Sequence, residues 1–95
     1  MIKSIKHKGL RKYFCKGQSK GLDQTLLRKI KDRLDVLDAA TKLEDLTIPS
    51  FDFHPYKGGK KGGHKAYTIH VNGPCVMTFK FIDGDVYDLD LESSH

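Results

Sequence analysis

The sequence predicts an α+β domain in which two N-terminal helices pack on an antiparallel sheet. Apolar residues recur at steps of three and four through the first 40 positions, which is the helical period. From position 51 the period becomes two, which is typical of strands. The 95 residues are assigned to one domain, residues 1–95, because two separate cores would each be too small to fold alone.

The two helices are predicted from apolar positions and from residues that begin or end helices. Leu10 and Phe14 lie four residues apart with basic residues between them, and Gly17 ends this first helix. Asp23 is a candidate N-cap for a second, longer helix, and Pro49 ends the helical half of the chain. The second helix carries one apolar stripe, formed by Leu26, Leu27, Ile30, Leu34, Leu37 and Ala40.

The strand-like half contains three alternating segments, over residues 67–71, 76–81 and 86–91, separated by turns at 72–74 and 83–84. A further short strand is expected just before His54. Residues 57–65 hold four glycines and four lysines, which predicts a mobile cationic loop. This loop lacks the order of a P-loop, so contact with a nucleic-acid backbone is favoured over nucleotide binding. The plainer alternative is a disordered hairpin tip that lysines keep soluble.

Basic and acidic side chains are separated along the chain. The 17 lysines and arginines outnumber the 12 aspartates and glutamates, giving a net charge of +5. Residues 1–33 carry eleven basic and two acidic side chains, residues 54–80 carry five lysines and no acid, and residues 83–92 carry five acids and no base. This separation favours a polyanion partner, most commonly a nucleic acid, although a solvated basic helix face gives the same pattern.

Several classes of protein are excluded by what the sequence lacks. No apolar run reaches the roughly 20 residues of a membrane span, so no membrane partner is expected. The charged start is unlike a secretory signal, and Cys15 and Cys75 form no CxxC pair, so both are expected to be reduced thiols in a cytoplasmic protein. No two histidines have HxH or HxxxH spacing, so neither a metal nor a cofactor is expected.

The histidines of the strand-like half are candidates for catalysis without a metal. Cleavage of RNA by its own 2′-hydroxyl needs a proton acceptor, a proton donor and cations near the phosphorane. Imidazole can carry out either proton transfer near neutral pH. Taken singly, each histidine is more often an incidental surface residue. The candidates are His54, His64, His70 and His95.

Several segments together resemble the HigB family, which are RelE-superfamily toxins of bacterial type II toxin–antitoxin systems. The resemblance runs along the whole chain and is more specific than the composition. The segments that carry it are residues 1–10 (MIKSIKHKGL), 34–41 (LDVLDAAT), 53–58 (FHPYKG), 78–81 (TFKF), 83–90 (DGDVYDLD) and the terminal His95.

The resemblance implies a RelE-like fold, in which the N-terminal helices pack on a curved antiparallel sheet. It also implies a metal-independent endoribonuclease that cleaves mRNA in the ribosomal A site, blocks translation, and is neutralised by a HigA-like antitoxin. Of the family's catalytic pattern, His54, Lys57 and His95 carry over to this chain.

The sequence departs from the family pattern at positions that matter for catalysis. Val76 stands where the family has an arginine taken to contact the scissile phosphate, and Cys75 stands in place of a tryptophan. The family's closing acid and tyrosine are replaced by Ser93 and Ser94. Loss of a guanidinium that faces a developing dianion costs on the order of 10² in rate.

Two functions of different class follow from these observations. In the first, the chain is an active mRNA endoribonuclease, in which His54 and His95 share the base and acid roles. The lysines Lys57, Lys60 and Lys61 hold phosphate. In the second, it is a catalytically weak or inactive relative that acts as an antitoxin- or ribosome-binding module. Direct DNA binding by the basic helices is less favoured, since no helix-turn-helix spacing is present. The residues expected to bind RNA are Lys60, Lys61, His64, Lys65 and His70.

Overall fold

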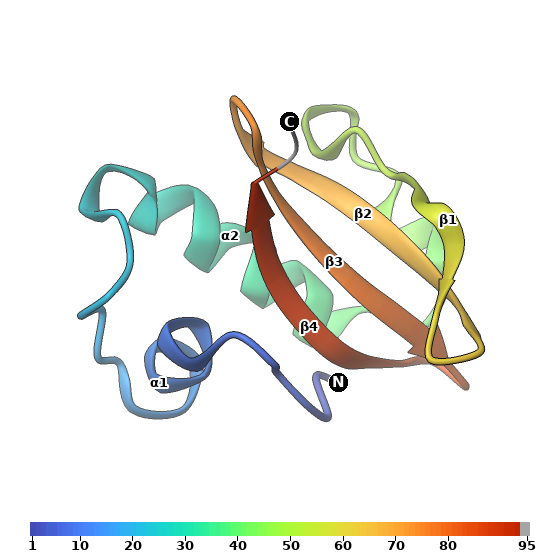
Figure 1. Ribbon diagram of the computed structural model, residues 1–95, viewed down its shortest axis with the longest axis horizontal. Helices are drawn as coiled ribbons and strands as arrows, with labels where there is room; N and C mark the ends of the chain where they lie inside the picture. The colour runs from blue at the N-terminus through green and yellow to red at the C-terminus, as the bar shows by residue number, and fades with distance from the viewer. Residues whose placement is uncertain (94–95) are drawn as a thin grey trace.

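The computed structural model describes residues 1–93 and has the predicted α+β architecture. Four antiparallel strands lie in the order β1-β2-β3-β4 and form one curved sheet, with α2 across one face (Figure 1). Three short 3₁₀ turns, Gln24–Leu26, Leu43–Leu46 and Pro49–Phe51, connect the larger elements. These elements are α1 (Lys8–Lys16), α2 (Leu27–Ala39), β1 (His54–Lys61), β2 (His64–Asn72), β3 (Cys75–Ile82) and β4 (Asp85–Ser93).

The helix ends follow from local hydrogen bonding. At the start of α1, Nδ1 of His7 accepts a hydrogen bond from the backbone N–H of Leu10, 3.1 Å away. Gly17 ends α1 in the left-handed conformation, at φ 71°. The carboxylate of Asp23 accepts a hydrogen bond from the N–H of Thr25. Asp23 therefore caps the 3₁₀ turn that leads into α2, and not α2 itself.

The core lies between α2 and the sheet. The predicted stripe of α2 is buried at Ile30, Leu34 and Leu37. It packs against alternating residues of the central strands, because successive strand side chains point to opposite faces. These sheet residues are Ile69, Val71, Met77 and Phe79. The opposite face of the central strands is therefore left to residues 68, 70, 76 and 78.

The N-terminal residues form an additional contact with the sheet that the sequence did not predict. Ile2 and Ile5 pair in parallel with Val86 and Leu89 of β4. The N–H of Lys3 donates to the carbonyl of Val86 at 2.7 Å, and all four paired residues are buried. This segment covers the outer edge of β4, which would otherwise present unpaired backbone groups.

Two predictions for the region around His54 are wrong. The short strand expected before His54 is a 3₁₀ turn, because Pro49 supplies the fixed φ of a helical first position. The tract 57–65, expected as a mobile loop, is mostly paired strand: β1 continues to Lys61 and β2 begins at His64. A two-glycine turn at 62–63 with positive φ permits this tight hairpin.

The cysteines are free thiols in the structure, as predicted. Cys15 is exposed, whereas Cys75 is half-buried, and burial raises the pKa of its thiol. Within residues 1–93, none of the helices has the length and apolar content needed to cross a membrane.

Candidate functional site

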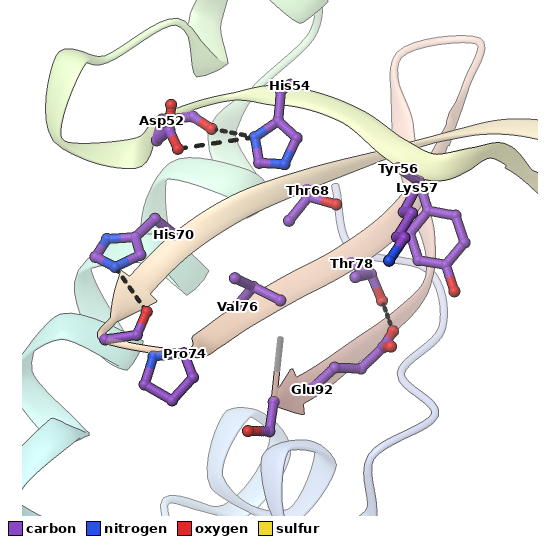
Figure 2. Close-up of a pocket in the computed structure, with 12 residues that line it drawn as sticks. Asp52, His54, Tyr56, Lys57, Thr68, His70, Pro74, Val76, Thr78 and Glu92 are labelled. Carbon is purple, nitrogen blue, oxygen red and sulfur yellow. Dashed lines mark hydrogen bonds and ion pairs between the residues drawn. The ribbon is translucent and has the colours of Figure 1, made fainter. Parts of the chain in front are cut away.

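A hollow of about 420 Å³ lies on the sheet face opposite α2. Strand alternation directs the polar residues of β2 and β3 into it, and β1 and β4 supply its two sides (Figure 2). We call this hollow the cleft. Its lining residues are Asp52, His54, Tyr56, Lys57, Thr68, His70, Gly73, Pro74, Val76, Thr78, Glu92 and Ser93.

The strand register arranges the cleft floor in two neighbouring rows. One row runs from His54 through Thr68 to Thr78, each paired with the next across a strand boundary. The other row runs from His70 through Val76 to Glu92. Directly paired residues on one sheet face have Cβ atoms about 5 Å apart. Val76 therefore lies between an imidazole and a carboxylate.

The imidazole of His54 is held by the turn before β1. Its Nδ1 lies 2.6 Å from the carbonyl oxygen of Asp52, which can only accept, so Nδ1 carries the hydrogen. This leaves Nε2 for contact with a ligand. Asp52 adopts a left-handed φ of 46°, which aspartate tolerates better than most residues, and its carboxylate lies 4.0 Å from Nδ1. The His54 side chain is 49% exposed and so is accessible to a ligand.

His70 is directed toward the β2–β3 turn. Its Nε2 lies 3.1 Å from the carbonyl oxygen of Gly73 and donates to it. That bond engages the nitrogen farthest from the backbone. His70 therefore lines the cleft but is tied to its rim (Figure 2).

A carboxylate, a hydroxyl and an ammonium form a connected group at the β4 side of the cleft. Thr78 donates a short hydrogen bond from Oγ1 to Oε2 of Glu92. Lys61 reaches across from β1, with Nζ 2.9 Å from Oγ1 of Thr78 and 3.4 Å from Oε2 of Glu92. The Lys61 ammonium also lies 5.2 Å from the centre of the Tyr56 ring. The Lys61 side chain is only 13% exposed, so the group is fixed in place.

Lys57 supplies the uncompensated positive charge of the cleft. It lines the cleft and is exposed. In the part of the chain that the structure describes, its ammonium forms no ion pair or hydrogen bond, in contrast to that of Lys61. Lys57 is thus available to an anionic ligand.

The other predicted site residues lie elsewhere. Lys60 and Lys65 are paired across the hairpin and line a separate hollow, together with Pro55 and Tyr67. His64 is exposed at the start of β2 and does not line the cleft. The lysines of the glycine-lysine tract therefore do not share one surface, because Lys57 lines the cleft and Lys60 and Lys65 line the other hollow. His95 and Ser94 lie outside the described residues.

Sequence analysis did not select several residues that line the cleft, among them Asp52, Tyr56, Thr68, Thr78 and Glu92. Tyr56 was noted only as part of the HPYKG segment, and Glu92 only as one of several acids. The alternation of β3 places Thr78 on the same face as Val76, so the sequence pattern could have identified Thr78 as a neighbour of Val76. The pairing of Val76 with Glu92 depends on register, which the sequence did not provide. Val76, at which the resemblance implies an arginine in the family, lines the cleft floor.

The cleft has no arrangement of side chains typical of a metal site. Among residues 1–93, no group of three or more His, Cys, Asp or Glu side chains lies close enough to hold an ion. The chemistry that its described residues can perform is proton transfer by His54 and Glu92 and charge stabilisation by Lys57.

The fold and cleft together define the class of protein. Two N-terminal helices on one face of an open antiparallel sheet, with a histidine- and lysine-containing cleft on the other, form a RelE-like toxin. Residues 3–94 match the family model described as the RelE-like toxin of the type II toxin–antitoxin system HigB. The chain belongs to this HigB family. It is 40% identical over 95 residues to Endoribonuclease HigB of Proteus vulgaris, with both chains covered in full.

Proposed function

We propose that this HigB-family toxin is a ribosome-dependent endoribonuclease that cleaves mRNA in the A site without a metal ion, and thereby blocks translation. One observation carries the proposal: a single cleft brings together His54, Lys57 and a carboxylate, which are groups that RNA cleavage requires. The name of the Proteus vulgaris relative supports the same reaction.

The residues have complementary roles in this proposal. His54 presents Nε2 for proton transfer, and Lys57 offers its ammonium to the phosphate. His95 shares proton transfer with His54, and His70 contacts RNA at the cleft rim. Lys60, His64 and Lys65 follow the RNA backbone along the hairpin, outside the cleft.

The proposed partners follow from family and charge. A HigA-like antitoxin neutralises the toxin in the cytoplasm, and the ribosome presents the mRNA. The exposed lysines of residues 1–33 provide a cationic surface that suits ribosomal RNA.

One observation favours a second function, that of a catalytically weak or inactive binding module. Val76 places an apolar side chain on the cleft floor. The resemblance to the family implies an arginine at this position. Without that guanidinium, the negative charge of the phosphorane depends on lysine alone, and lysine is a less preorganised partner than arginine.

Expression of the toxin without its antitoxin separates the two functions. We expect growth arrest and new mRNA 5′ ends within translated codons, mapped by primer extension. The His54→Ala variant, expressed to the same level, should abolish these ends. Healthy growth with intact mRNA would instead establish the binding module.

Ribosome dependence needs a second measurement. A short mRNA is incubated with purified toxin and a chelator, either free or bound in the A site of programmed ribosomes. Cleavage restricted to the ribosome-bound mRNA supports the proposal, whereas equal cleavage of free mRNA would refute its ribosome-dependent part.

A further inference from the structure

We propose that Glu92 is the proton acceptor of the cleavage reaction and that His54 is the proton donor. The inference rests on the proposed endoribonuclease function and assigns roles within it. It starts from the position of the two residues, which line the same cleft from its two outer strands, β1 and β4 (Figure 2).

The separation of these side chains suits the geometry of the reaction. In the attack of a 2′-hydroxyl on the adjacent phosphate, the nucleophile and the leaving 5′-oxygen lie on opposite sides of phosphorus. The acceptor and donor must therefore face each other across the phosphate. Strands lie about 4.8 Å apart, so three intervals place β1 and β4 roughly 14 Å apart at the backbone. His54 and Glu92 both line the cleft, with Thr68, Val76 and Thr78 of the two central strands between them in strand order.

Glu92 is held as a proton acceptor should be. Thr78 and Lys61 both contact Oε2, so among residues 1–93 no hydrogen bond engages Oε1, the oxygen that remains to take up a proton. The contacts come from β3 and β1, which fixes the carboxylate from two sides. Lys61 forms an ion pair with the carboxylate, which holds the side chain at the cleft edge.

His54 is held as a proton donor should be. Its Nδ1–H donates to the carbonyl of Asp52 in either charge state. The Asp52 carboxylate, 4.0 Å from Nδ1, is suitably placed to accompany an imidazolium. In the imidazolium form both ring nitrogens carry hydrogen, so Nε2 carries the proton that the leaving group needs.

The proposed step balances as a transesterification. The 2′-hydroxyl gives its proton to Oε1 of Glu92 as the 2′-oxygen forms a bond to phosphorus. The bond from phosphorus to the 5′-oxygen breaks, and Nε2 of His54 transfers its proton to that oxygen. The products are a 2′,3′-cyclic phosphate and a 5′-hydroxyl, and proton exchange with water restores both residues.

The first test replaces each of the two glutamates of the chain by its amide. Glu92→Gln keeps the shape of the side chain but removes its basicity, so single-turnover cleavage of mRNA on programmed ribosomes should fall at least about 10²-fold. Glu44→Gln is the matched control, since Glu44 is exposed on a 3₁₀ turn outside the cleft. Circular dichroism and thermal unfolding confirm that both variants fold.

The second test distinguishes acceptor from donor. An mRNA with sulfur in place of the bridging 5′-oxygen at the cut site has a leaving group that departs without a proton. His54→Ala should cleave this mRNA nearly as fast as the wild type does, whereas Glu92→Gln should remain slow.

The outcomes separate this inference from the proposed function. Cleavage by Glu92→Gln at the wild-type rate would return the acceptor role to a histidine and overturn the inference while leaving the function intact. The opposite result, in which the sulfur-containing mRNA restores cleavage by Glu92→Gln but not by His54→Ala, would overturn the inference. It would make Glu92 the donor and His54 the acceptor. No cleavage by the wild-type toxin would refute the function, and the inference with it.

Discussion

Arg33 of α2 donates a hydrogen bond from Nε to the backbone carbonyl of His70 on β2, 2.9 Å away. The same guanidinium donates to the carbonyl of Ser50 at 3.4 Å and lies 4.7 Å over the ring of Phe51. Arg33 is only 5% exposed. A single buried cation from the helical layer thus joins two segments next to the cleft, the turn before Asp52 and the end of β2.

Replacement of Arg33 by methionine should destabilise the protein. The substitution keeps much of the apolar stem but leaves two carbonyl groups without their donor, at a cost of about 2–4 kcal/mol in the free energy of unfolding. Urea unfolding followed by circular dichroism measures this difference. Arg28→Met is the matched control, because Arg28 is exposed on the same helix and should change stability by less than about 0.5 kcal/mol. Equal effects of the two substitutions would contradict the structural role of Arg33.

Introduction of an arginine at Val76 should increase cleavage. Val76 is half-buried on the cleft floor between His70 and Glu92, where a guanidinium would face the phosphate. The expected gain in single-turnover cleavage is on the order of 10². Val76→Leu adds bulk without charge and should give no gain. A Val76→Arg variant that folds but cleaves no faster would show that the charge is already supplied elsewhere.

The lysines of the hairpin should contribute unequally to cleavage. Lys57 lines the cleft, whereas Lys65 lines the separate hollow beside Lys60. Lys57→Ala should therefore lower the single-turnover rate at saturating ribosome-bound mRNA by about 10²-fold, because it removes charge next to the phosphate. Lys65→Ala should mainly weaken binding and reduce its salt dependence. Similar losses of rate in both variants would argue that the hairpin acts as one unspecific cationic surface.

Stability should depend on pH through Asp88. The ammonium of Lys80 donates to its carboxylate at 2.7 Å and lowers the pKa of Asp88 from the ordinary value, with a further contribution from Ser4. A lowered folded-state pKa means that the stabilisation is fully present above about pH 3.9 and is lost as the pH falls through the folded-state value.

Asp88→Asn tests this dependence and suits the left-handed φ of 52° at this position. The site is partly exposed, so the variant should lose only about 0.5 kcal/mol at pH 6. The difference from wild type should shrink in urea unfolding below pH 4. A constant difference across this range would assign the effect to packing instead of charge.

The fold could be predicted from sequence where periodicity was sustained. The stripe of α2 and the alternation of β2 and β3 each extend over several residues, and the turns between strands carry glycine. The pairing of Ile2 and Ile5 with β4 could not be predicted, because two isolated apolar residues define no period. The glycine-lysine tract was wrongly predicted as a loop for a different reason. Gly58 and Gly59 form an irregularity within a paired strand, and glycine content alone does not distinguish such an irregularity from a loop.

The cleft was predictable only where the residue type indicated chemistry. His54, Lys57 and His70 were identified and lie in the cleft. Glu92 was grouped with the acids of β4, which the structure shows pairing with neighbouring cations, as in Lys80–Asp88 and Lys61–Glu92. Its place beside Val76 follows from pairing between strands, which composition and spacing do not encode.

The parallel contact between the N-terminal segment and β4 also bears on when the toxin matures. Residues 1–6 leave the ribosome first, yet their hydrogen-bonding partners at Val86 and Leu89 are made after every helix and the other three strands. Pairing between such distant parts of a chain is slow and cannot begin early in synthesis. A growing chain therefore lacks β4, which carries both the pairing partners of residues 1–6 and the cleft residue Glu92. The proposed cleavage of ribosome-bound mRNA would in this way spare the ribosome that is still producing the toxin.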